Sequence, residues 1–383
     1  MARKALVVCG SHSIPWPRFE SIIHRVASTE LTLLLILDGA RPQGVNTASV
    51  ITDLQKAIVN AEPFELLEVL SCTSLLQATD PRDKLYSLLG VVAAARKGSP
   101  VEKPDYTISS DVLFKRTATS QLKEKGSLNL LSFVEHGNDI TELVPSWVPR
   151  WSRSPAGRNA FAQYSTHFAT TGSSKPVYRL AGNDCELAVS GLFLGFIKVT
   201  TVFLEIEDAT DEKRDKFQFE GVSHDEDPAL PEALRRTLIC NMTMDGQLPG
   251  SEHDEIFEAF CECLRTLNSD PNSPKFDGWD AHDDAWVERQ CRYADLYEQC
   301  LGCWNGGRAF CVTTKQRMGM VPRAAKEGDS ICVFLGAKTP FVVRPAGNGK
   351  YRLVGECYVH ALMSGEIMNI PGFDKKIEEI ILI

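Results

Sequence analysis

The spacing of apolar residues changes period near the middle of the chain, and this change constrains the fold more than any other feature. In the first part, apolar residues recur at helical spacing, as in Phe64, Leu67 and Leu70. In the later part they alternate with polar residues, as in Leu187 and Val189. Because a period of 3.6 predicts helices and a period of two predicts strands, the chain is predicted to have an α+β fold.

Three regions follow from these patterns. Residues 1–135 are expected to form a mainly helical N-terminal half, and residues 136–176, rich in Ser, Pro, Gly and Trp, a connecting loop laid over a surface. Residues 177–383 are expected to form an antiparallel β barrel or sandwich, interrupted by an acidic helical insertion at about 205–305. Within the strands, Gly347-Asn348-Gly349 predicts a tight hairpin, and Gly191 predicts a bulge or turn.

Five helices are predicted in the N-terminal half: Phe19 to Ala27, Val50 to Asn60, Phe64 to Leu76, a helix after Asp80, and Val112 to Lys125. The fourth of these has a detailed start signal. Asp80 is expected to be the N-cap, Pro81 the first helical residue, and Asp83 a favourable charge at the positive end of the macrodipole. Gly90 is expected to end this helix, and Lys84 to pair with Asp80 one turn away.

Charge and hydropathy exclude several classes of protein. Residues 205–300 hold 25 acidic and 9 basic side chains, a net charge of −16 in a chain whose total is −9. An acidic segment of this kind, without basic stripes elsewhere, argues against nucleic-acid binding. The longest apolar run, Leu31 to Leu37, is too short to span a membrane, and the first residues lack a secretory signal. We therefore expect a cytoplasmic protein that binds neither nucleic acid nor membrane.

The twelve cysteines raise the question of a metal site. Cys300 and Cys303 have the spacing of a zinc-binding pair, with His282, Cys291 and Cys311 nearby in sequence. However, zinc knuckles need two such pairs, and Cys261-x-Cys263 would point in different directions from a helix. Reduced, buried thiols are the favoured interpretation, with no metal and no cofactor.

The run from Asp80 to Gly90 reads DPRDKLYSLLG, and it resembles the "DPRDK-x-Y-x-LLG" signature of fungal heterokaryon-incompatibility (HET) proteins. Further segments resemble motifs of the same family in the same order. They are PDY at 104–106, LVPSWVPRWS at 143–152, GDS at 328–330, GAKTPFVVRP at 336–345, YRLVGECYVH at 351–360 and MSGE at 363–366. Arg150 stands where the family usually has Asp, and Ala361 where it usually has Gly.

The resemblance singles out twenty residues, to which we assign structural rather than catalytic roles. They are Asp80, Pro81, Arg82, Asp83, Lys84, Tyr86, Pro145, Trp147, Pro149, Trp151, Gly336, Pro340, Arg344, Pro345, Gly355, Glu356, Tyr358, His360, Gly365 and Glu366. Among them, Trp147 and Trp151 are expected to pin the proline-rich loop to the core, and Glu356 is expected to face a polar rim.

The resemblance also implies what this chain lacks. The HET domain proper of the family lies upstream of the matched motifs and resembles TIR domains, some of which consume NAD. The chain is therefore expected to be a C-terminal portion of a HET protein, either a truncated paralogue or a clipped gene model. The implied function is a non-enzymatic, accessory or regulatory part in fungal non-self recognition and programmed cell death, acting through a protein partner or self-association.

An enzymatic alternative stays open at this point. It places an unrecognised site in the β region around Arg344, Glu356 and His360, where a shared pocket would support it. A nucleophilic pair of Cys357 and His360 is disfavoured, because a separation of three residues puts the two side chains on opposite faces of a strand.

Overall fold

The computed structural model describes residues 5–27, 43–60, 65–74, 76–95, 103–137, 140, 144–152, 161, 167–202, 229–267 and 283–383. The chain divides into two compact units. The first comprises Met1–Ser110 with Trp151–Ser154, and the second comprises Asp111–Arg150 with Pro155–Ile383. The expected region ends at 135 and 176 stay predictions, which these two units do not test.

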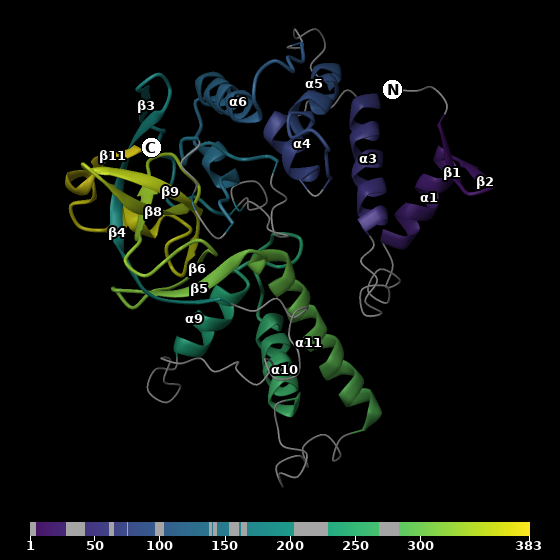
Figure 1. The fold of residues 1–383 in the computed structure, drawn as a ribbon. Coiled ribbons are helices and arrows are strands. Elements are labelled where there is room, and N and C mark those ends of the chain that lie inside the picture. Colours follow the sequence, from purple (N-terminus) through teal and green to yellow (C-terminus); the bar gives the residue numbers. More distant parts are fainter. Residues whose placement is uncertain are drawn as a thin grey trace. The chain divides into compact units, whose positions relative to one another are not determined.

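The first unit is mainly helical, as its apolar periodicity predicts (Figure 1). Its elements are β1 (Leu6–Cys9), β2 (His12–Pro15), α1 (Trp16–Ala27), α3 (Gln43–Val59), α4 (Leu66–Cys72) and α5 (Asp83–Ala95). The short antiparallel β1–β2 hairpin was not expected from the sequence. It turns at Gly10, whose φ of 58° is a backbone conformation that glycine adopts readily.

The end of α5 differs from the prediction. The helix continues through Gly90 to Ala95, so Gly90 is an interior residue rather than the residue that ends the helix. Glycine weakens a helix by about 1 kcal/mol relative to alanine, but it does not stop one when the following residues still fit. Val91 and Val92, both half-buried, follow Gly90 and extend the apolar surface of the helix.

The second unit combines helices with a β sheet (Figure 1). Its helices are α6 (Ser110–Lys125), α9 (Ala229–Leu238), α10 (Glu252–Leu267) and α11 (Asp284–Asn305), with short 3-10 helices at Asn129–Phe133, Glu366–Asn369 and Phe373–Lys376. Its strands are β3 (Tyr178–Ala181), β4 (Glu186–Val202), β5 (Arg308–Thr313), β6 (Met318–Pro322), β7 (Ser330–Phe334), β8 (Pro340–Gly347), β9 (Lys350–Glu356), β10 (Tyr358–Val359) and β11 (Glu378–Leu382).

Five of these strands pair in a ring. β4 pairs with β7, β7 with β8, β8 with β9, β9 with β11, and β11 returns to β4. The long β4 then continues past the ring and pairs with β5, which is followed by β6 and β10. The α+β prediction is therefore confirmed, and the strands of the C-terminal half belong to one nine-stranded sheet.

One pairing corrects the expectation of an antiparallel sheet. β11 runs parallel to β9, with Ile381 opposite Lys350 and Leu382 opposite Tyr351, so the sheet is mixed. Parallel neighbours need a long crossover connection, and here the chain between β9 and β11 supplies it. The local alternation of apolar residues is the same in parallel and antiparallel strands, so it could not distinguish them.

The glycines and the hairpin of the sheet also test the sequence pattern. The predicted hairpin is confirmed: β8 and β9 are joined at Asn348 and Gly349, whose φ values of 53° and 70° fit a two-residue turn. Gly191 is not a bulge, because the register shifts in β4 lie between Phe193 and Gly195 and between Ile197 and Val199. A Cβ at Gly191 would lie 2.3 Å from a neighbouring carbonyl oxygen, so this glycine permits close strand approach.

Two apolar clusters fill the second unit, one on each face of β5 and β6. Ala309 and Cys311 belong to the cluster inside the sheet, while Phe310 belongs to the cluster beneath the helices. The helices α10 and α11 lie side by side (Figure 1), and the ring of Tyr297 contacts the ring of Phe260 at 5.0 Å between centroids. The period of two in the strands therefore distributes their side chains between two cores.

Candidate functional site

The signature run that begins at Asp80 forms a turn immediately ahead of α5. Asp80 Oδ1 accepts a hydrogen bond from the backbone N–H of Arg82 at 2.9 Å, and the N–H of Asp83 donates to the Asp80 carbonyl at 3.0 Å. Pro81 lies inside this turn, where its missing N–H costs little. Asp80 thus caps a turn that precedes the helix, and the helix itself begins later than expected, at Asp83.

The Arg82 guanidinium links this turn to the segment that contains Tyr106. Its Nε donates to Asp80 Oδ1 at 2.9 Å and its Nη2 donates to Asp80 Oδ2 at 2.6 Å, a bidentate pair. Its Nη1 donates to the carbonyls of Tyr106 at 2.6 Å and Ile108 at 2.9 Å. Four of the five N–H groups that an arginine carries are therefore bound within the fold.

The electrostatics of this turn follow from the same contacts. The hydrogen bonds from Arg82 lower the pKa of Asp80 from 3.8 to about 2, and the hydrogen bond to Asp80 raises the pKa of Arg82. The pKa of Tyr106 is raised, first because its hydroxyl donates to the carboxylate of Asp83 at 2.5 Å. The charges of the turn neutralise one another.

Tyr86 and Lys84 make further links between the same segments. The Tyr86 hydroxyl donates to the Asp105 carbonyl at 2.8 Å, and the rings of Tyr86 and Tyr106 meet edge to face at 5.2 Å. Lys84 Nζ donates to the carbonyl of Ser74 at 3.0 Å and to that of Leu76. The predicted ion pair between Lys84 and Asp80 is therefore wrong. Arg82 pairs with the Asp80 carboxylate, and Lys84 binds carbonyls of the segment that follows α4.

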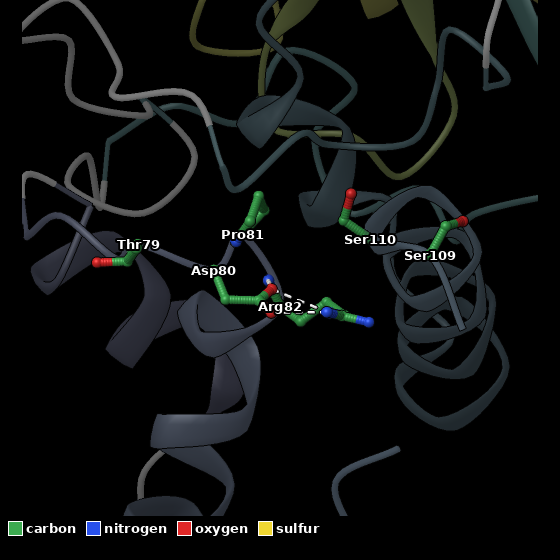
Figure 2. Close-up of a pocket in the computed structure, with 6 residues that line it drawn as sticks. All are labelled: Thr79, Asp80, Pro81, Arg82, Ser109 and Ser110. Atoms are coloured by element: carbon green, nitrogen blue, oxygen red, sulfur yellow. Dashed lines mark hydrogen bonds and ion pairs between the residues drawn. The ribbon is translucent and has the colours of Figure 1, made fainter. Parts of the chain in front are cut away.

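A surface hollow of about 500 Å³ lies beside the turn (Figure 2). Thr79, Asp80, Pro81, Arg82, Ser109 and Ser110 line it. Figure 2 shows the charged side chains of Asp80 and Arg82 bound to each other rather than presented to the hollow. The contacts of the turn join two segments of the chain. The side chains that line the hollow offer hydroxyl groups to a ligand, rather than an unpaired charge or a nucleophile with a neighbouring base.

We expect Arg82→Lys to loosen the segment around Tyr106. Lysine keeps the positive charge but lacks the planar fork that reaches the carboxylate and two carbonyls together. Chymotrypsin, which cleaves after tyrosine, should cut at Tyr106 several-fold faster in the variant, because the segment opens more often. Arg292→Lys is the matched control, since Arg292 forms an exposed ion pair with Glu288 one helical turn away. Equal cleavage rates in the two variants would contradict this role of Arg82.

The contribution of Asp80 should depend on pH. Its pKa in the folded protein, about 2, is lower than its ordinary value of 3.8. The stabilisation is therefore complete above the ordinary pKa and is lost as the pH falls through about 2. The protection factor of the Arg82 amide, which corrects for the intrinsic exchange rate, should fall over this acid range in the wild-type protein. Asp80→Asn should flatten that response, and an unchanged acid profile in this variant would argue against the assignment.

Glu356, one of the residues proposed for the enzymatic alternative, is fully buried. Its Oε1 lies 2.9 Å from Arg308 Nη2, and both side chains have no exposed surface. The backbone N–H of Phe161 donates to the same oxygen at 2.8 Å, and the Arg308 guanidinium lies 3.6 Å from the centre of the Phe161 ring. The expectation that Glu356 faces a polar rim is wrong, because Arg308, which the sequence analysis did not single out, neutralises it in the core.

Arg344 and His360 contact residues other than Glu356. Arg344 makes a bidentate pair with Asp329, with distances of 2.8 and 2.7 Å, and donates to the Ala324 carbonyl at 2.7 Å. His360 Nδ1 lies 3.3 Å from the hydroxyl of Tyr358, and burial lowers the pKa of its imidazole. Arg344 thus pairs with Asp329, Glu356 with Arg308, and His360 lies beside Tyr358, so each of the three has its own partner.

The tryptophans and prolines of the middle motif are mostly inside the protein. Trp147 is fully buried and its Nε1 donates to the Cys185 carbonyl at 3.4 Å, while Trp151 is 9% exposed. Pro149 is buried, and the Pro145 carbonyl accepts from the N–H of Val148. These positions fit loop anchors, the role that the sequence analysis assigns to the two tryptophans.

The remaining motif residues hold the backbone of the C-terminal part. Pro340 starts β8, and its carbonyl accepts from the N–H of Cys357. Pro345 is exposed at the far end of the same strand. Glu366, also exposed, accepts from the N–H of Ser364 at 2.7 Å. Three motif glycines have positive φ: Gly336 at 76°, Gly355 at 149° and Gly365 at 93°.

All twelve cysteines are free, and they differ in exposure. Five are buried, three are partly buried, and Cys9, Cys72, Cys185 and Cys291 are exposed, so the expectation of buried thiols is wrong for these four. Burial raises the pKa of Cys300 to about 11. Within the described ranges, no group of three or more His, Cys, Asp or Glu side chains has the arrangement of a metal site. His282 lies outside those ranges.

Comparisons with known proteins agree with the motifs. A family model for the Het-6 β-barrel domain matches residues 253–372. Heterokaryon incompatibility protein 6, OR allele, from Neurospora crassa is 24% identical over an alignment that covers 76% of this chain and 49% of that protein. The chain therefore spans about half the length of this relative. No solved structure matches the chain.

The motif order and both comparisons point to the same fungal family. The matched residues 253–372 include α11, β5 to β10 and the buried pair of Arg308 and Glu356. Among the described residues, no helix is both long enough and apolar enough to cross a membrane. The chain is similar to the fungal heterokaryon-incompatibility proteins, and its residues 253–372 match the Het-6 β-barrel domain.

Proposed function

We propose that this chain is a non-enzymatic, accessory or regulatory part of a HET-type protein that contributes to fungal non-self recognition and to programmed cell death. The relative from Neurospora crassa is named for heterokaryon incompatibility, which supports a role in the same process. In this proposal the chain acts in the cytoplasm by binding a protein partner or a second copy of itself. Binding then shifts a neighbouring HET domain between two states.

The observation that carries the proposal is the engagement of the charged motif residues within the fold. Arg82 is bound to Asp80 and two carbonyls, Arg344 to Asp329, and Glu356 to Arg308. A catalytic acid, base or anion-binding group needs to face a substrate. Side chains that already join one segment of the chain to another are suited to holding a scaffold, which supports a role in binding rather than in chemistry.

The proposal keeps the expected division of labour along the chain. The helical region 1–135 is proposed to support the HET domain, with 136–176 as the connecting loop. The β region 177–383 and its acidic insertion at about 205–305 are proposed to receive the partner. Exposed carboxylates on α10 and α11, such as Glu255, Glu258 and Glu288, support a partner surface that is basic.

The test separates binding from catalysis. We expect the purified chain to leave NAD unchanged over hours, and deletion of its gene to alter heterokaryon formation between strains that the wild type distinguishes. Re-introducing the gene with His360→Asn should restore the wild-type response, because a binding function does not need that imidazole. NAD consumption above the level of a heat-denatured sample, or loss of the response in the folded His360→Asn variant, would overturn the non-enzymatic proposal.

A further inference from the structure

The turn between β3 and β4 lies against α6, and a lysine and a cysteine meet there. Lys115 Nζ lies 3.5 Å from the sulfur of Cys185 and donates to the Asn183 carbonyl at 3.2 Å. The Cys185 thiol lies 3.8 Å from the same carbonyl. The amine, the thiol and the carbonyl therefore form a small cluster that joins residues far apart in sequence.

The backbone of the turn fixes the position of this thiol. Gly182, Asn183 and Asp184 all have positive φ, with values between 55° and 58°. Asparagine, aspartate and glycine are the residues that tolerate this conformation best. The N–H of Cys185 donates to the carbonyl of Ala181 at 3.1 Å and closes the turn.

Two further contacts hold the turn on α6. Lys123, two helical turns after Lys115, pairs with Asp184 at 3.3 Å. Tyr178 at the start of β3 donates its hydroxyl hydrogen to the Leu122 carbonyl at 2.6 Å. The approach of Cys185 to Lys115 is therefore set by several neighbouring contacts rather than by the lysine alone.

Cys185 is also accessible to small oxidants. It is exposed, whereas Cys332 and Cys357 are fully buried and their thiols have a pKa raised by desolvation. Exposed thiols oxidise first to sulfenic acid, and a nearby nitrogen can condense with that acid. A lysine amine on a flexible stem, already in contact with the sulfur, is placed to do so.

We propose that Cys185 and Lys115 form an oxidation-dependent covalent sulfur–nitrogen cross-link between the β3–β4 turn and α6. Hydrogen peroxide first oxidises the thiol: Cys–SH and H2O2 give Cys–SOH and H2O. The neutral Lys115 amine then attacks sulfur: Cys–SOH and Lys–NH2 give Cys–S–NH–Lys and H2O. In the first step the sulfur loses two electrons to peroxide. In the second step the S–N bond forms as the S–O bond breaks, and the departing hydroxide takes one amine hydrogen and leaves as water.

The cross-link has a predictable effect on unfolding. It closes a loop from residue 115 to residue 185, which restricts the unfolded chain more than the folded one. The oxidised protein should therefore unfold at a higher temperature than the untreated protein, and a thiol reductant should reverse the shift.

The experiment treats the full chain with hydrogen peroxide, digests it, and searches for linked peptides by mass spectrometry. We expect a peptide pair joined through Cys185 and Lys115 whose mass is the sum of the two less two hydrogens. Lys115→Arg should abolish the pair, because the guanidinium keeps the charge but stays protonated. Lys123→Arg is the matched control and should retain it, and Cys185→Ser should remove it.

The alternative outcomes overturn the proposal. They are Cys185 found only as sulfinic or sulfonic acid, Cys185 in a disulfide with a second chain, a link that retains an oxygen atom, or an unmodified thiol. A linked pair that persists in Lys115→Arg would show that another nitrogen captures the sulfur. Circular dichroism of each variant before treatment confirms that loss of the link does not come from loss of the fold.

Discussion

Replacing Glu356 with alanine is expected to lower the free energy of unfolding by about 3–5 kcal/mol, because the substitution leaves the Arg308 guanidinium charged and buried without its partner. Both side chains are fully buried and lie 2.9 Å apart. The variant also removes the acceptor of the Phe161 N–H, which lies 2.8 Å from the carboxylate. Urea denaturation of the whole chain, followed by tryptophan fluorescence, measures the loss.

A second substitution separates the two causes. Adding Arg308→Met to Glu356→Ala removes the uncompensated charge, so part of the lost stability should return. The unsatisfied N–H of Phe161 stays, and it should hold the double variant about 1–3 kcal/mol below the wild type. Glu327→Ala, at an exposed position, is the control and should change stability by less than about 0.5 kcal/mol. A double variant no more stable than Glu356→Ala would argue against the buried pair as the cause.

Replacing Gly336 with alanine should cost about 3 kcal/mol, from backbone strain and from overpacking together. Its φ of 76° disfavours any side chain, and a Cβ at this position would lie 2.3 Å from the nitrogen of Pro176. Because the atom that it meets belongs to backbone, the clash cannot be relieved by rotating a side chain. The midpoint of urea unfolding should shift accordingly.

Gly328 is a matched control within the same family motif. Its φ is 86°, but a Cβ there has nothing within 4 Å. Gly328→Ala should therefore show the backbone strain alone, about 1 kcal/mol. The difference between the two variants measures the close approach at Pro176. If both variants lose the same stability, Gly336 is required for its positive φ and not for its close packing against Pro176.

Local patterns in the sequence predicted the elements well. The alternation in Phe310 and Val312 predicted β5, and the helical spacing around Leu67 and Leu70 predicted α4. Each pattern indicates which side of an element is buried. The boundaries were less accurate. Gly90 did not end α5, since the preference of glycine for helix ends is weaker than the packing of the residues that follow.

Long-range pairing could not be derived in the same way. β9 and β11 are neighbours in the sheet. However, no residue pattern within either strand predicts which strand it pairs with or whether the pairing is parallel. The same limit explains the site. Glu356 was recognised from its motif, yet its burial depends on Arg308, which lies 48 residues earlier in the chain. Arg82 and Tyr106 were both inside quoted motifs, but only the fold shows that they meet.

The order of strands in the ring has a consequence for biosynthesis. β11 follows every other strand of the ring in sequence, yet it lies between β4 and β9. During translation the ring cannot be completed before residues 378–382 have left the ribosome. Until then β4 and β9 each present an unpaired edge, which can recruit other chains. A cell that makes this protein must shield those edges, and we expect its yield to depend on chaperones that bind nascent strands.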